Sequence, residues 1–350
     1  MHYICSISDL ISDGDLKSLA DNLDELANEA GDEKWDHVIE KSKASLFYNA
    51  KCCKPKDGPL KYLSVTVFED CSPETLRDFY MDCDYRTQWD KTVVAHEQLQ
   101  IDQGSGIEIG RTIKKFPLLT PREYVLAWKV WEGSNRTFYC FTKVSTESYS
   151  LPNADDLYQE CEHPLAPVQK KFVRVAFFRS GWRIRPVCIV LVPGRNACEI
   201  KMVHQEDAGL NAEFAKLAFA RGIWSYVCKM DDALRKYSSP HRSQSSSNMT
   251  AVSLIQKVPR ELDAIVREET SNLVTGSSND IYRLGDDGAN SRKIKRTPSK
   301  KMIANGLLLL GGLICLTQGN SGLGAKVAVA FVLKKLSKRG SSCNHNQRNK

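Results

Sequence analysis

Apolar residues in the first two thirds of the chain follow a helical spacing at both ends and a strand-like spacing in between. A helix is predicted from about residue 16 to Gly31, because apolar residues recur there at intervals of three and four: Leu16, Leu19, Leu23, Leu26 and Ala30. The run 60–68 alternates and predicts a strand. Ser72 and Pro73 then supply an N-cap and a first-turn proline for a second helix. Its apolar stripe is Leu76, Phe79, Tyr80 and Cys83.

A series of strand-like runs follows this second helix. Each run is rich in β-branched or aromatic residues and is bounded by Gly, Pro, Asn or Ser. The runs cover residues 93–101, 107–116, 123–131, 136–144, 171–178, 182–192 and 198–204. Turns as short as Gly104-Ser105-Gly106 join consecutive runs, and a parallel pair would need a longer crossover. The pattern therefore predicts an antiparallel sheet.

A long helix is predicted from about Leu210 to Tyr237. Its apolar stripe is Phe214, Leu217, Ala218, Trp224, Val227 and Leu234. The order of elements indicates an α+β domain over residues 1–237, in which the last helix is available to cover one face of the sheet. A cavity remains between helix and sheet if the two do not pack flush.

The basic excess of the chain lies in its C-terminal part. The formal net charge is +7, of which residues 238–350 contribute +11 and residues 1–237 contribute −4. A domain that binds nucleic acid is expected to show the reverse distribution, so no nucleic-acid partner is predicted. Residues 238–300 are rich in Ser, Gly and Asn, and we expect a flexible polar and basic linker there, with one short helix at 258–266.

A hydrophobic segment is predicted at 301–337, followed by a basic tail at 338–350. Residues 302–316 carry no charge and would span roughly 22 Å as a helix, less than the roughly 30 Å of a bilayer core. Lys and Arg flank both ends of the segment. A single short span, a hairpin that returns to the same side and a packed helix all stay open, and we expect membrane attachment without a fixed topology.

Several kinds of chemistry find no signature in the sequence. The 12 cysteines include no CxxC pair, and no His/Cys cluster has zinc spacing, which predicts reduced thiols, no metal and no cofactor. The N-terminus lacks a basic n-region, so no signal peptide is expected. No catalytic residues are predicted, because GxSxG, HExxH and paired-carboxylate motifs are absent and His96 and His204 are isolated.

The most informative segment runs from Asp70 to Asp90. Arg86 and Asp90 stand four residues apart beside large aromatic residues, among them Tyr80 and Trp89. Charged groups surrounded by apolar side chains either pair with each other in a core or contact a ligand. Both interpretations stay open from the spacing alone.

The segment 68–90 resembles the START lipid-transfer family, and further motifs follow in that family's order. These motifs are Phe116-Pro117, Thr120–Val125, Arg179–Trp182 and His204–Gly209. The resemblance covers about residues 15–237, and the overall pattern is similar to plant START proteins with a C-terminal hydrophobic tail. It implies a helix-grip fold, in which a curved antiparallel sheet wraps around the long C-terminal helix with a lipid between them.

The resemblance also implies site residues. Tyr80, Arg86 and Asp90 match the residues that contact the lipid phosphate in family members that bind phosphatidylcholine. The planar guanidinium of an arginine suits this contact, because it binds two phosphate oxygens at once. Tyr124 matches one aromatic of the choline cage. The other two cage positions fall on Arg111 and near Cys188 or Ile189, which are not aromatic, so choline selectivity is not predicted.

Two further features follow from the resemblance. The loop with Asp207, Gly209, Leu210 and Asn211 matches the family's mobile lid, although Asp207 is also suited to cap the following helix. Residues 145–159 and 186–192 look like extra sequence, either as real insertions or as an artefact of the gene model. As an insertion, the first is expected to form a long surface loop, and the second to disturb either strand register or the tunnel wall. For Arg122 and Glu123, a second polar pair near the tunnel is one interpretation, and a solvated turn is the favoured one.

The first functional hypothesis is a protein that binds a lipid, in particular a phospholipid, in an internal tunnel and transfers or presents it at a membrane. The second is a membrane-anchored lipid sensor. The third is an enzyme that acts on a hydrophobic substrate in the same cavity, which is disfavoured for lack of a catalytic motif. Under the first two, the START domain is expected in the cytosol and attached to a membrane by the C-terminal segment.

Overall fold

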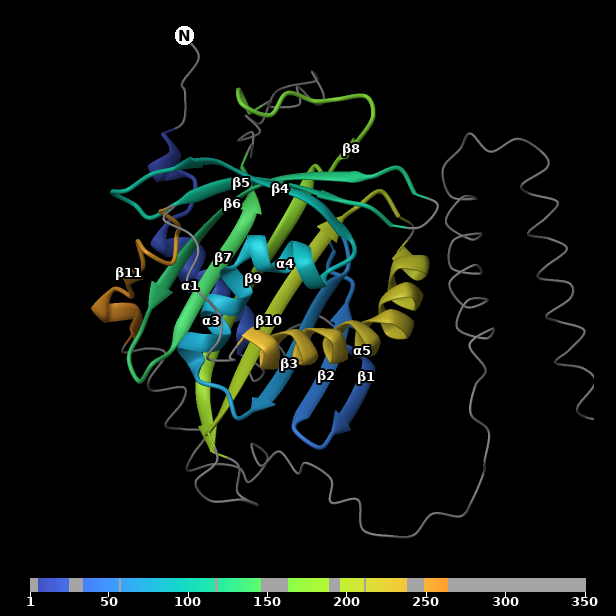
Figure 1. Cartoon of the computed structure of the whole chain (residues 1–350), viewed down its shortest axis with the longest axis vertical. Helices are drawn as coiled ribbons and strands as arrows, with labels where there is room; N and C mark the ends of the chain where they lie inside the picture. The colour runs from blue at the N-terminus through green and yellow to red at the C-terminus, as the bar shows by residue number, and fades with distance from the viewer. Residues whose placement is uncertain are drawn as a thin grey trace, which may run out of the picture. The chain divides into compact units, whose positions relative to one another are not determined.

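The strands form one sheet in the computed structural model, which describes residues 6–24, 34–56, 58–116, 119–145, 163–188, 196–210, 212–237 and 249–263. Neighbouring strands follow the order β1-β2-β3-β10-β9-β7-β6-β5-β4, and all of these pairs are antiparallel (Figure 1). The strand bounds are β1 Asp36–Lys43, β2 Leu46–Cys53, β3 Lys61–Glu69, β4 Val93–Ile101, β5 Glu108–Lys114, β6 Arg122–Glu132, β7 Phe138–Val144, β9 Phe177–Cys188 and β10 Asn196–Asp207. Two short strands, β8 Val173–Arg174 and β11 Gln256–Lys257, pair with β6 in parallel. The predicted antiparallel sheet is confirmed.

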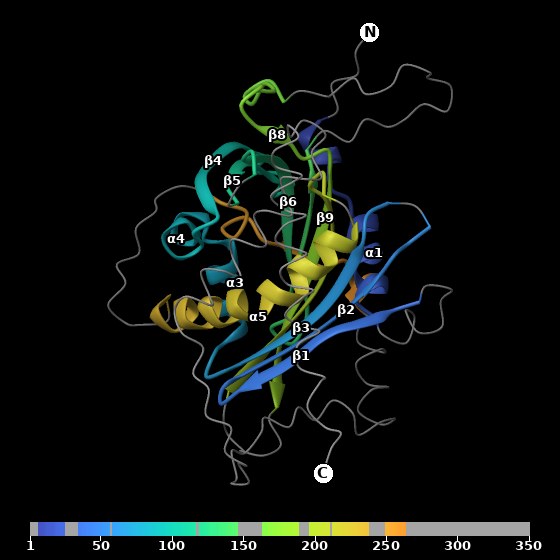
Figure 2. The same ribbon diagram turned by 90° about the vertical axis from the view of Figure 1, so that its right-hand side faces the viewer.

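Helices cover both faces of this sheet (Figure 2). Their bounds are η1 Ile7–Asp9, α1 Asp13–Leu23, α3 Pro73–Met81, α4 Cys83–Trp89 and α5 Ala212–Tyr237. Residues of α3 and α5 share one apolar core with β2, β6, β9 and β10, whereas α1 belongs to a second core on the other face. The long helix therefore lies over the sheet as the α+β helix-grip architecture requires.

These elements belong to one unit of the chain, made of residues 1–114 and 121–288. Residues 115–120 and 289–350 form a second unit, of which the structure describes only 115–116 and 119–120. The predicted membrane segment 301–337 and basic tail 338–350 lie outside the described residues. Among the described helices, none combines the length and hydropathy needed to cross a bilayer.

The helix predicted after Ser72 is interrupted at Asp82. Ser72 caps α3 by accepting a hydrogen bond from the Thr75 backbone N–H at 3.1 Å. Asp82 leaves the helical conformation and caps α4, because its carboxylate accepts from the Tyr85 N–H at 2.6 Å. A short polar side chain that bonds its own downstream backbone starts a new helix. This break turns α4 and places Arg86 on a helix of its own.

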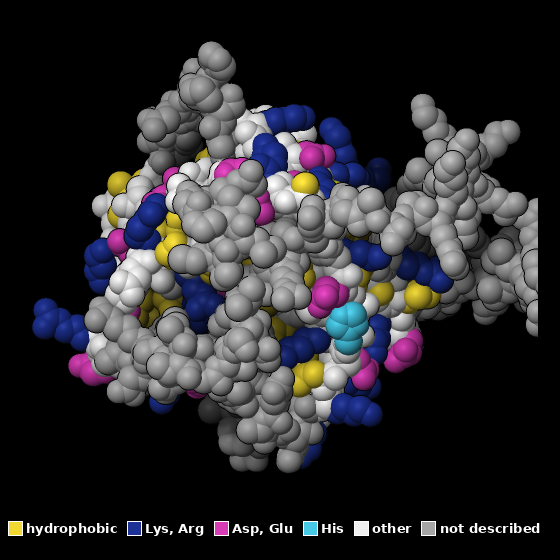
Figure 3. Space-filling model, turned by 90° about the horizontal axis from the view of Figure 1, so that it is seen from below, with side chains coloured by type: hydrophobic (Ala, Val, Ile, Leu, Met, Phe, Trp, Pro, Cys, Tyr) yellow, Lys and Arg dark blue, Asp and Glu magenta, His cyan; other side chains and the backbone are white. Residues whose placement is uncertain are grey.

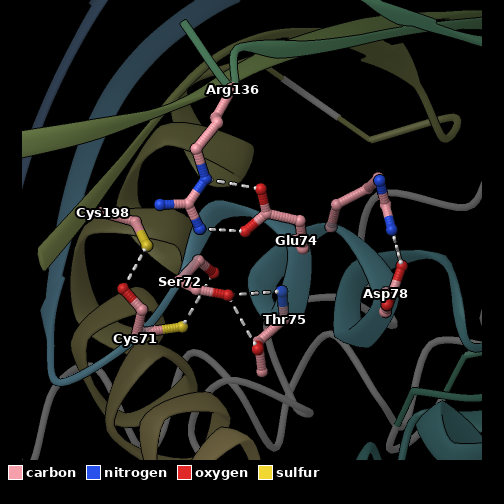
Figure 4. A network of polar contacts seen from close by, with 8 residues as sticks. Cys71, Ser72, Glu74, Thr75, Asp78, Arg136 and Cys198 are labelled. Atoms are coloured by element: carbon pink, nitrogen blue, oxygen red, sulfur yellow. Dashed lines mark hydrogen bonds and ion pairs between the residues drawn. The ribbon is translucent and has the colours of Figure 1, made fainter. Parts of the chain in front are cut away.

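The N-terminal end of α3 is fastened to the β6–β7 turn and to β10 (Figure 4). Glu74 accepts a bidentate pair of hydrogen bonds from Arg136, which stands in the turn with a φ of +58°. The Cys198 thiol on β10 donates to the Cys71 carbonyl oxygen at 2.7 Å. These contacts fix where α3 begins relative to the sheet.

The sequence patterns miss β1 and β2 and divide β9 differently. Strand β1 is mostly exposed at the edge of the sheet and lacks apolar alternation, which hides it from periodicity. The runs predicted at 171–178 and 182–192 become β8 and one continuous strand, β9. The expected register disturbance is absent over 177–188, where β9 pairs with β10 residue by residue. Residues 189–192 and 146–159 lie outside the described part.

The predicted linker is wrong for residues 249–263, which pack on the sheet. The backbone N–H of Ala251 donates to the buried Glu108 carboxylate at 2.7 Å. The Asp263 carboxylate accepts from the backbone N–H and the hydroxyl of Ser134, both at 3.1 Å. Between them β11 pairs with the end of β6. We call residues 249–263 the strap.

Candidate functional site

A cavity of about 330 Å³ lies among α3, α4, α5 and the sheet. Apolar and aromatic side chains form much of its wall, including Leu126, Trp128, Trp182, Met202, Ile223 and Val227. Side chains on one face of a strand recur at every second residue. Residues 200, 202, 204 and 206 of β10 therefore all reach the cavity. The interior is accordingly not filled by side chains.

One polar cluster in the wall is built around Arg86 of α4. Its Nη2 donates to the Tyr226 hydroxyl of α5 at 3.3 Å, and its Nε lies 3.9 Å from Asp90 Oδ2. Among the described residues, Nε has no hydrogen-bond partner although it is buried. The side chain is 34% exposed and lines the cavity. The guanidinium therefore keeps unused donors for an anion.

Asp90 supports this cluster from outside the cavity wall. Its carboxylate is 6% exposed and accepts from the Thr92 N–H at 3.0 Å and the Thr92 hydroxyl at 2.7 Å. The Tyr226 hydroxyl donates to the second oxygen at 3.4 Å. Asp90 is thus held by its own turn, and its negative charge lies beside Arg86 without neutralising it through a close ion pair.

A second polar cluster lies where β5, β6 and β10 meet the cavity. The Tyr124 hydroxyl donates to Glu206 Oε1 at 2.5 Å, and His204 Nε2 lies 3.3 Å from Glu206 Oε2. The Lys114 ammonium sits 4.8 Å from the centre of the Tyr124 ring and has no ion pair with any described residue. Phe178 contacts both Tyr124 and His204 edge-on. All five side chains line the cavity.

Burial and the neighbouring groups shift the pKa values of Glu206 and Lys114 in the second cluster. Burial alone would raise the pKa of Glu206, but the hydrogen bond and charge of His204, the Lys114 charge and the Tyr124 hydroxyl outweigh it and lower the pKa to about 2. Burial lowers the pKa of Lys114, which the Glu206 charge partly restores. Glu206 is therefore held ionised inside the cavity.

No family model matches the chain, but individual proteins are similar to it in sequence, and two of them are named as lipid transfer proteins. The chain is 35% identical to human phosphatidylcholine transfer protein over 92 residues, which are 26% of this chain and 40% of that protein. It is 24% identical to human StAR-related lipid transfer protein 7, mitochondrial, over 166 residues, or 45% of this chain and 38% of that protein. The chain thus matches less than half the length of these relatives.

The folded body of this chain is a START domain. Among solved structures, human StAR-related lipid transfer protein 5 superimposes with a TM-score of 0.46 at 16% identity, over 65% of this chain and 98% of that chain. Human STARD10 superimposes with a TM-score of 0.42 at 16% identity, over 58% of this chain and 74% of that chain.

The START domain brings three of the four predicted lipid-contact residues to the cavity wall. Tyr80, Arg86 and Tyr124 line it, and Asp90 stands behind Arg86. Burial raises the pKa of the Tyr80 hydroxyl above its ordinary value. Their contact with a lipid stays a prediction.

The predicted lid loop is held by hydrogen bonds from Arg122, a residue that was expected in a solvated turn. Arg122 is fully buried and donates to the Ala208 carbonyl oxygen from Nε at 3.3 Å and Nη2 at 3.2 Å. Asp207 accepts from the Gly209 N–H at 2.8 Å, and Gly209 has a φ of +69° with open space around it. Leu210 is half-buried, and Asn211 lies outside the described residues.

Glu123 is also fully buried, so the solvated turn expected for Arg122 and Glu123 is wrong. Its carboxylate accepts from Arg111 Nε at 2.6 Å and Arg174 Nε at 3.0 Å. Arg111, which occupies a cage position in the resemblance, is therefore committed to Glu123 and does not line the cavity.

Several cavity residues were missed by the sequence analysis, among them Lys114, Phe178, Glu206 and Tyr226. The predicted stripe of the last helix was also shifted, because Leu217 is 40% exposed while Phe219, Ile223, Tyr226, Val227 and Met230 face the cavity. The alternation along β10 would have identified Glu206, because Ile200, Met202 and Glu206 lie on the same face of the strand. No local sequence pattern pointed to Tyr226, because its hydrogen-bond partner Arg86 is 140 positions away.

Proposed function

We propose that this protein binds a phospholipid in the cavity between α5 and the sheet and transfers it between membranes or presents it at one. The observation that carries the proposal is an apolar cavity whose wall contains a guanidinium with unused donors. Phosphate is the anion that such a planar fork binds best in a desolvated site. The two sequence relatives, human phosphatidylcholine transfer protein and human StAR-related lipid transfer protein 7, are both lipid transfer proteins by name, which supports the same class of function.

Binding energy and selectivity would come from different parts of the lipid. Burial of acyl chains is worth about 0.8 kcal/mol per methylene, so the apolar wall supplies most of the affinity. Arg86, supported by Tyr226 and Asp90, would hold the phosphate and set the depth of the head group. The loop at 207–210, which contains Gly209 with a φ of +69° in open space, would open to admit the lipid.

Membrane attachment through residues 301–337 is a separate part of the proposal. Each basic residue beside an anionic membrane surface adds about 1 kcal/mol of attraction. Under this proposal the START domain works in the cytosol, and residues 264–300 set how far it can reach. On the face seen in Figure 3, Lys/Arg and Asp/Glu side chains are interspersed.

A lipid sensor is the second candidate, and the strap favours it. Ala251 of the strap is 1% exposed and belongs to the apolar core that includes the cavity residues Trp128, Val227 and Met230. A change in the cavity on lipid binding would thus reach the segment that leads to the C-terminal region. A sensor would bind lipid and transfer it poorly between vesicles, whereas a transfer protein would do both.

The test is extraction of lipid from vesicles by the full chain, with Arg86→Ala compared with Arg221→Ala. Arg221 is exposed on α5, so its loss removes a cation without touching the cavity. We expect Arg86→Ala to extract at least about tenfold less phospholipid, the scale of one charge-assisted phosphate contact, and Arg221→Ala to match the wild type. Equal extraction by all three proteins would remove Arg86 from the head-group site.

A further inference from the structure

The cavity wall carries both signs of charge. Arg86 and Lys114 are its cations, and Glu206 is the carboxylate among the described residues that line it. Asp90 adds a second carboxylate just behind Arg86. Two cations and one carboxylate therefore face a ligand that would be desolvated on entering, and Asp90 offsets part of the Arg86 charge from behind the wall. A net-neutral head group with one negative and one positive end matches this balance better than a singly charged one.

Glu206 is built to accept further hydrogen bonds. Tyr124 and His204 each contact one of its two oxygens, at 2.5 Å and 3.3 Å. A carboxylate offers about four lone-pair sites, so half of them stay open. The side chain is 20% exposed and lines the cavity, and its neighbours hold it ionised. A fixed, ionised carboxylate in an apolar cavity is a strong acceptor for a cationic N–H donor.

We propose that Glu206 binds the head-group nitrogen of the lipid, and that the site selects a phospholipid with a primary ammonium over one with a quaternary ammonium. The inference rests on the proposed phospholipid function and adds the substrate class to it. A primary ammonium donates up to three hydrogen bonds, whereas a quaternary ammonium donates none.

Two aromatic rings near Glu206, those of Tyr124 and Phe178, already contact other groups and do not form an open cage for a quaternary ammonium. Such a cation binds over aromatic faces. The Tyr124 ring already has the Lys114 ammonium at 4.8 Å from its centre. Phe178 meets Tyr124 and His204 edge-on at ring distances of 6.0 Å and 5.2 Å. A ligand cation here is therefore recognised through the carboxylate and its hydrogen bonds.

Lys114 connects the carboxylate to the phosphate site. Its charge interacts with Glu206, Arg86 and Asp90, so it lies within electrostatic reach of both polar clusters. With no ion pair to a described residue, its ammonium is available to a phosphate held by Arg86. A phosphate and an ammonium joined by a short linker would thus meet Arg86 and Lys114 at one end and Glu206 at the other.

The test uses the full chain and vesicles that contain equal amounts of four phospholipids with identical acyl chains. Their head-group nitrogens carry three, two, one or no N–H bonds, and mass spectrometry quantifies what the protein extracts. We expect uptake to fall along the series, with the primary ammonium favoured over the quaternary one on the order of tenfold, the scale of one charge-assisted hydrogen bond. Equal or greater uptake of the quaternary lipid would overturn the proposal.

Two variants test whether Glu206 is the source of the preference for a primary ammonium. Glu206→Gln should reduce the preference to below about threefold while total uptake persists, since the amide accepts weaker hydrogen bonds. Glu213→Gln, at an exposed position of α5, should keep the wild-type preference. A preference unchanged in a folded Glu206→Gln protein would overturn the assignment to Glu206. If that variant does not fold, the N–H series on the wild type decides alone. A wild type that extracts none of the four lipids would contradict the phospholipid function itself, which is a distinct outcome.

Discussion

Arg86 on α4 donates a hydrogen bond to the Tyr226 hydroxyl on α5, with 3.3 Å between Nη2 and the hydroxyl oxygen. The same hydroxyl donates to Asp90 at 3.4 Å. The helix that covers the cavity therefore helps to position the cation inside it. A movement of α5 that admitted a lipid would also change the surroundings of the guanidinium.

Replacing Tyr226 with Phe removes both of these hydrogen bonds and keeps the ring. We expect phospholipid affinity to fall about threefold to tenfold, because Arg86 becomes less well positioned, and unfolding free energy to fall by about 1 kcal/mol. Equilibrium binding to labelled lipid and urea unfolding measure the two effects. Tyr237→Phe, on the same helix but outside the cavity wall, is the matched control. Unchanged binding in Tyr226→Phe would show that Arg86 is positioned without it.

The pKa of Glu206, held at about 2, makes stability depend on pH. Because the folded-state pKa lies below the ordinary carboxyl value, this contribution is fully present above about pH 4.5 and is lost as pH falls toward 2. We expect it to reach on the order of 2 kcal/mol at neutral pH. Urea unfolding of wild type and Glu206→Gln from pH 7 to pH 2.5 should give a stability difference that shrinks on acidification. A difference that is constant with pH would refute the assigned ionisation.

The strap should be part of the folded domain. A chain that ends at residue 248 loses the Ala251 N–H, which donates to Glu108 Oε2 while Gln98 donates to Oε1. Losing this hydrogen bond and uncovering apolar core costs about 2–4 kcal/mol in total. We expect a lower melting temperature for the chain 1–248 than for the chain 1–288. Equal melting temperatures would place the strap outside the cooperative unit.

Gly110 lies behind the cavity residue Trp128. A Cβ at this position would overlap the Trp128 ring, and it would lie 3.1 Å from His96 Cε1. Gly110→Ala should therefore displace the indole, at a cost of about 1–3 kcal/mol in unfolding free energy. The displaced ring should also lower lipid uptake. Thermal unfolding and vesicle extraction test this, and full stability with full uptake would contradict the tight fit.

Periodicity predicted most of the fold because most of its elements bury one face. The helix α5 and strands β3 to β7 were each predicted from runs of apolar, β-branched or aromatic residues. Strand β1 has no such pattern, because its residues are mostly exposed at the sheet edge. The strap was also missed, since its attachment depends on single polar contacts such as Ala251 with Glu108 rather than on a repeated apolar face.

The site was only partly predictable for a related reason. Arg86 and Tyr80 stood out because a charged residue among aromatics is unusual within one segment. Lys114 and Glu206 belong to strands far apart in sequence and come together only through the order of strands in the sheet. Local spacing carries no information about that order, so the second polar cluster required the structure.

The most direct test of the lipid-carrier account is native mass spectrometry of the full chain recovered from cells. The account predicts one phospholipid bound per protein in the wild type and in Arg221→Ala, and its loss in Arg86→Ala. A wild-type protein recovered without lipid, or with the same bound lipid in Arg86→Ala, would contradict it.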